Sequence, residues 1–72
     1  MDEFELEIAS IARALTDKHP ELDPLTLGFR GLAKRIREIG AGTPRALDDP
    51  DWIEAVQRTW HGMFLERQGT GA

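Results

Sequence analysis

The four prolines constrain the fold of this chain more than any other feature, because each stands at a predicted helix boundary. Proline lacks the backbone N–H that a helix interior needs, but it fits the first helical position. Three prolines follow a residue that can cap a helix, in the pairs Asp23–Pro24, Thr43–Pro44 and Asp49–Pro50. The residue before a proline is pushed out of helical geometry, so His19–Pro20 predicts a helix end.

Apolar residues recur at helical spacing between these boundaries. A first helix is predicted from Asp2 or Glu3 to Asp17, with acidic residues in its first turn, where the helix dipole favours them. Its apolar face consists of Phe4, Ile8, Ile11, Ala12 and Leu15. A second helix is predicted from Pro24 to a left-handed cap at Gly40. Its stripe is the most regular in the chain and consists of Leu25, Phe29, Leu32, Ile36 and Ile39.

The last predicted helix has the sequence "PDWIEAVQRTWHGMFLERQ". Trp52 stands at its entrance, and one face consists of Ile53, Val56, Trp60, Met63 and Phe64. Three long helices with one apolar stripe each predict an all-α fold, a small three-helix bundle with a short connecting helix near residues 44–47. We expect one helical domain over residues 1–68 and a flexible tail over residues 69–72.

The residue types argue against catalysis. The 72 residues contain no cysteine, which excludes disulfides and thiolate ligands from this sequence. His19 and His61 stand far apart, and neither has an acidic residue at a metal-binding spacing. We therefore expect no catalytic residue, no cofactor and no metal site, and a protein that is not an enzyme.

Three further features bear on origin and location. The N-terminus is acidic where a secretion signal is basic, and no apolar run has membrane-spanning length. We therefore expect a cytoplasmic protein that does not bind a membrane. Arginine outnumbers lysine, a bias that is frequent in GC-rich bacterial and phage genes, so we expect a bacterial or phage origin.

Charge is unevenly distributed along the chain. The formal net charge is −4, yet residues 24–47 carry a net positive charge between two acidic flanks. Arg30, Lys34 and Arg37 are spaced by four and three residues, so they share one helix face. This basic face is either a solvated surface paired with acids of the first helix, such as Glu7, or a contact for an acidic partner.

The last helix offers a second candidate contact. Tryptophan and methionine are enriched where proteins bind each other, although in a small bundle such residues often fill the core. The candidate contacts are Trp60, Met63 and Leu65. The leading hypothesis is therefore a non-enzymatic protein-protein interaction module, acting as a regulator, an inhibitor or an assembly factor. We expect a monomer or a weak homodimer, the latter formed through the edge at residues 60–65.

The alternative hypothesis is a DNA-binding transcriptional regulator with a helix-turn-helix over residues 30–47. Its first half, the sequence "LAKRI", resembles the first helix of this motif in phage-repressor-like domains. The predicted second helix departs from the motif, because Arg45 is its one basic residue and Asp48 and Asp49 follow. Acidic residues beside a DNA contact oppose phosphate binding, so nucleic acid is the less favoured partner.

Overall fold

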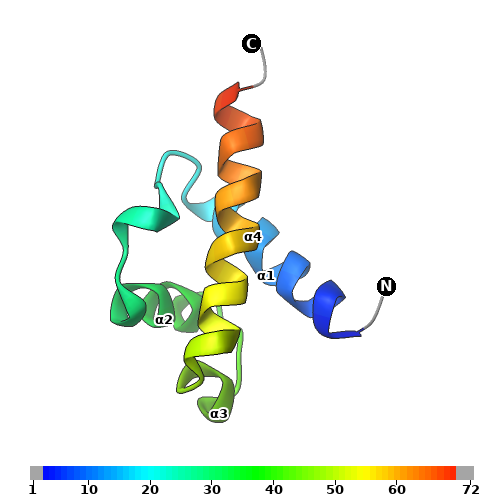
Figure 1. Ribbon diagram of the computed structural model, residues 1–72, viewed down its shortest axis with the longest axis vertical. Coiled ribbons are helices and arrows are strands. Elements are labelled where there is room, and N and C mark those ends of the chain that lie inside the picture. The colour runs from blue at the N-terminus through cyan, green and yellow to red at the C-terminus, as the bar shows by residue number, and fades with distance from the viewer. Residues whose placement is uncertain (1–2, 70–72) are drawn as a thin grey trace.

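Helix α4 is the element against which the rest of the chain packs (Figure 1). The computed structural model describes residues 3–69, and these form helices and turns without strands. The elements are α1 (Glu3–Lys18), the 3₁₀ turn η1 (Pro24–Thr26), α2 (Phe29–Glu38), α3 (Pro44–Leu47) and α4 (Pro50–Gly69). The predicted all-α class is confirmed. None of these helices is long and apolar enough to span a membrane.

Some sequence predictions fall at the ends of the described chain. Asp2, one of the two predicted starts of the first helix, lies outside the described residues, and α1 begins at Glu3. Of the predicted tail, Gly69 is the last residue of α4, and residues 70–72 lie outside the described part.

Three helix starts have the capping predicted from the sequence. The Asp23 carboxylate accepts a hydrogen bond from the Leu25 N–H at 2.9 Å, and the Thr43 hydroxyl accepts one from the Ala46 N–H at 3.1 Å. The Asp49 carboxylate accepts the Asp51 N–H at 3.0 Å. Each bond satisfies a backbone donor that the helix itself leaves free.

The predicted second helix is not continuous, which corrects the sequence analysis. Leu27 (φ −96°, ψ 135°) and Gly28 (φ −79°, ψ 178°) are extended and separate η1 from α2. Local bonds compete with helix continuation here, since the Thr26 hydroxyl donates to the Asp23 carbonyl at 2.7 Å. The Gln57 amide of α4 also donates to the Pro24 carbonyl at 3.1 Å and holds the turn against α4.

This break divides the predicted apolar stripe. Leu32 and Ile36 are buried, but Leu25 is 57% exposed and Phe29 is 42% exposed. Phe4 of α1, also predicted for the core, is 51% exposed and borders a surface hollow between α1 and α4. These three apolar side chains therefore lie at the surface.

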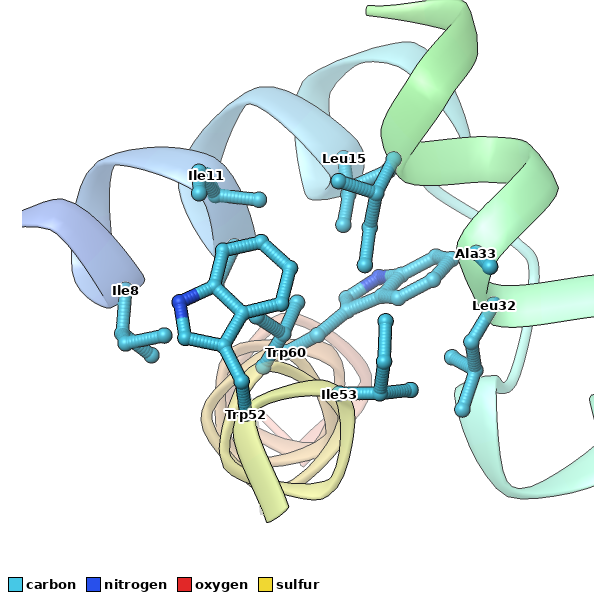
Figure 2. Close-up of a cluster of buried hydrophobic side chains, with 11 residues drawn as sticks. Ile8, Ile11, Leu15, Leu32, Ala33, Trp52, Ile53 and Trp60 are labelled. Atoms are coloured by element: carbon cyan, nitrogen blue, oxygen red, sulfur yellow. The ribbon is translucent and has the colours of Figure 1, made fainter. Parts of the chain in front are cut away.

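The core is centred on the two tryptophans of α4 (Figure 2). Their rings point from α4 toward α1 and α2, with Trp52 beside Ile8 and Ile11 and Trp60 extending toward Ala33. Trp60 has no accessible surface, although its indole N–H finds no hydrogen-bond partner. The remaining buried apolar residues are Ala12, Leu15, Leu32, Ile36, Ile53 and Val56.

We predict that Trp60→Ala lowers the free energy of unfolding by about 3–5 kcal/mol, because it leaves a large cavity where three helices meet. Small domains are stable by about 5–15 kcal/mol, so the variant loses a large share of its stability. Urea titration followed by far-UV circular dichroism measures the loss. Leu65→Ala, at a 52% exposed position of the same helix, is the control and costs under about 0.5 kcal/mol. Equal losses for both variants contradict the prediction.

Replacing glycine with alanine is predicted to change the free energy of unfolding in opposite directions at two positions. Gly40 has φ +74°, so Gly40→Ala forces a left-handed side-chain residue and costs about 1–2 kcal/mol. Gly62 lies inside α4, and an added Cβ there meets no atom within 4 Å. Gly62→Ala therefore stabilises the protein by about 0.5–1 kcal/mol. Thermal unfolding of both variants checks the signs, and a shared sign contradicts them.

Candidate protein-binding surface

The basic face predicted from the sequence borders a surface hollow of about 350 Å³. Arg30, Lys34 and Arg37 are all exposed along α2. The connection after α2 brings the end of α3 beside them, so that Leu47 and Asp48 complete the wall. Phe29 and Ala33 supply the apolar part of the same hollow. We call this feature the basic hollow.

Phe29 is the part of the candidate site that sequence reasoning missed. It lines the basic hollow and also a second hollow of about 310 Å³ between α2 and the start of α4, which Leu27, Glu54 and Gln57 border. The Phe29 side chain therefore lies between the basic hollow and a second hollow that has both charged and apolar lining residues. Its helical spacing placed it in the core, and only the break at Leu27 and Gly28 brings it to the surface.

The three cations of the basic hollow form no ion pair with any other described residue. Within residues 3–69 the ion pairs join Arg35 to Glu38 at 3.2 Å, Arg58 to Glu54 at 2.6 Å and Arg67 to Asp17 at 4.0 Å. None involves Arg30, Lys34 or Arg37. The predicted pairing of this face with acids of the first helix is therefore wrong for these three residues.

Arg35 differs from its neighbours because it forms an ion pair within α2. Its guanidinium donates a hydrogen bond to the Glu38 carboxylate, and this bond lowers the pKa of Glu38 below its usual range. The charges of Arg35, Lys18 and Lys34 act in the same direction. Arg35 is thus committed to its own helix and does not line the basic hollow.

The predicted contacts on the last helix do not join this surface. Trp60 is completely buried, which corrects its prediction as a partner contact, because its ring fills the space between α1 and α2. Met63 is half-buried and borders a separate hollow formed by α1 and α4. Leu65 is 52% exposed. The C-terminal half of α4 lies at the opposite end of the molecule from α3 and away from α2 (Figure 1).

In the helix-turn-helix predicted over residues 30–47, the second helix is only one turn long. The candidate recognition helix is α3, which has four residues, Pro44–Leu47. One helical turn does not extend along a major groove as a recognition helix does. Arg45 on α3 is exposed but lies outside the basic hollow.

The histidines contribute no evident site. The His19 ring lies 6.4 Å from the Trp60 ring, and the His61 ring lies 6.5 Å from the Phe64 ring, measured between centroids. No three histidine or acidic side chains of the described chain are grouped as they would be around a metal ion. The basic hollow with Phe29 is therefore the most distinctive surface of the described residues.

We predict that Arg35→Ala raises the pKa of Glu38 toward its usual value, since the variant removes the hydrogen bond that lowers it. Because the folded-state pKa is depressed, the pair stabilises the fold at neutral pH, and this contribution disappears as the pH falls through that pKa. Carboxyl NMR titration of the wild type and the variant measures the change. An unchanged Glu38 titration contradicts the assignment.

No curated protein and no solved structure matches the chain. A family model does match it, over residues 6–64, and that family is described as iron-sulphur cluster assembly. The match covers most of α1, most of α4 and every element between them. The chain belongs to the iron-sulphur cluster assembly family.

Proposed function

We propose that this protein acts in iron-sulphur cluster assembly as a non-enzymatic binding protein, and that its basic hollow binds an acidic surface of another assembly protein. One observation carries the proposal. Three cations that form no ion pair within residues 3–69 surround a hollow that has a large, exposed aromatic side chain on its edge.

The two kinds of side chain have complementary roles in such a contact. Arg30, Lys34 and Arg37 steer an acidic surface toward α2 and orient it, which raises the association rate and fixes the register. Phe29 loses its remaining water contact when a partner covers it, and apolar burial supplies affinity. A partner with one apolar side chain between carboxylates fits this surface.

The lack of cysteine supports a role through contact with other proteins. Iron-sulphur clusters are held mainly by cysteine thiolates, and these 72 residues offer none. We therefore assign cluster ligation to the partner. In this proposal the protein regulates or assists the partner, in the cytoplasm of a bacterium.

The test measures binding to each purified cluster-assembly protein encoded in the same genome. Lys34→Glu/Arg37→Glu reverses two charges of the basic hollow and is expected to weaken binding at least about tenfold, because attraction becomes repulsion. Phe29→Ala weakens it by a similar factor through lost apolar contact. Arg45→Glu is the matched control, an exposed cation outside the hollow, and changes affinity less than about twofold. Isothermal titration calorimetry at two salt concentrations measures all four proteins.

Two results contradict the proposal. The first is that none of the assembly proteins binds the wild type. The second is that Arg45→Glu weakens binding as much as the hollow variant does. The same proteins are titrated with duplex DNA, and DNA binding that depends mainly on Arg45 favours the transcriptional regulator instead.

A further inference from the structure

The first two turns of α1 form an exposed acidic segment with apolar side chains. Glu3 and Glu7 are exposed and spaced by four residues, so they lie on one face of the helix. Leu6, beside them, is 54% exposed. The segment 3–10 contains acidic residues and no basic ones.

This segment cannot reach the basic hollow of its own chain. Figure 1 shows the N-terminal end of α1 and helix α2 on opposite sides of α4. The ion pairs of the described chain agree, since none connects Glu3 or Glu7 to α2. The molecule therefore has an acidic and a basic surface that face different directions.

We propose that the first two turns of α1 of a second copy occupy the basic hollow. Glu3 and Glu7 of one copy lie opposite Arg30, Lys34 and Arg37 of the other, and the spacings of four residues on both helices match. Leu6 then covers Phe29 and removes two exposed apolar side chains from water.

Two electrostatic effects oppose this contact. Asp48 is part of the hollow and repels the incoming carboxylates, but three cations outnumber it. The net charge of −4 also makes two copies repel each other at long range. Physiological salt screens charges that lie more than about 8 Å apart, whereas pairs in contact are screened less. The contact is thus favoured locally and remains weak enough to be reversible.

Self-association and partner binding would use the same hollow and exclude each other. A second copy would keep the hollow covered until an assembly protein with a better-matched acidic surface displaces it. The self-association itself does not depend on the proposed function, since it needs only the two surfaces of this chain.

Charge exchange between two variants tests the contact. Glu3→Lys/Glu7→Lys makes both surfaces basic, and Arg30→Glu/Lys34→Glu makes both acidic. Each variant alone is expected to lose the self-association of the wild type, whereas an equimolar mixture regains it, because every acidic surface then meets a basic one. Sedimentation equilibrium from about 10 μM to 1 mM, a range in which weak self-association is populated, measures the mass. Arg45→Glu is the control and associates like the wild type.

All four substituted positions are exposed, so each variant is expected to keep its helices. Far-UV circular dichroism checks this. Raising the salt concentration weakens the association of the wild type. A wild type that stays monomeric at every concentration overturns the proposal, and so does a mixture of variants that fails to associate. Neither result bears on binding to assembly proteins, which the calorimetry measures separately.

Discussion

Burial of the two α4 tryptophans is the interaction on which the rest of the structure depends. Trp60 and Trp52 are 0% and 6% exposed, and together they contact the apolar sides of α1 and α2. Aromatic side chains of this size bury about 150–250 Å² each, which is a large share of the core of so short a chain. With no disulfide to help, the positions of α1 and α2 follow from how they cover these two rings.

The helix boundaries could be predicted well because their causes are local. Asp23, Thr43 and Asp49 cap the backbone directly after them, and the left-handed φ of Gly40 ends the preceding helix. The break after Thr26 was not predictable from apolar spacing, since Leu25 and Phe29 continue the helical stripe perfectly well. The break is stabilised by the local bonds of η1 and also by a contact with Gln57, which is thirty-three residues from Pro24.

The candidate site could be predicted only in part for a related reason. Helical spacing alone places Arg30, Lys34 and Arg37 on one face. It does not show that the end of α3 closes a hollow beside them, because that depends on the path of the chain through Gly40 and Gly42. Nor does it distinguish a buried tryptophan from an exposed one. The sequence places Trp60 both on the apolar face of the last helix and among the candidate contacts, and tertiary packing buries it.

Within residues 3–69 the three cations of the basic hollow form no ion pair, so the fold does not depend on them. Leu32 and Ile36 hold α2 in place from its buried side, while Arg30, Lys34 and Arg37 add almost nothing to that packing. Mutation can therefore rewrite the exposed side of α2 without disturbing the core. The charge of this face and the arrangement of the helices can therefore change independently of each other.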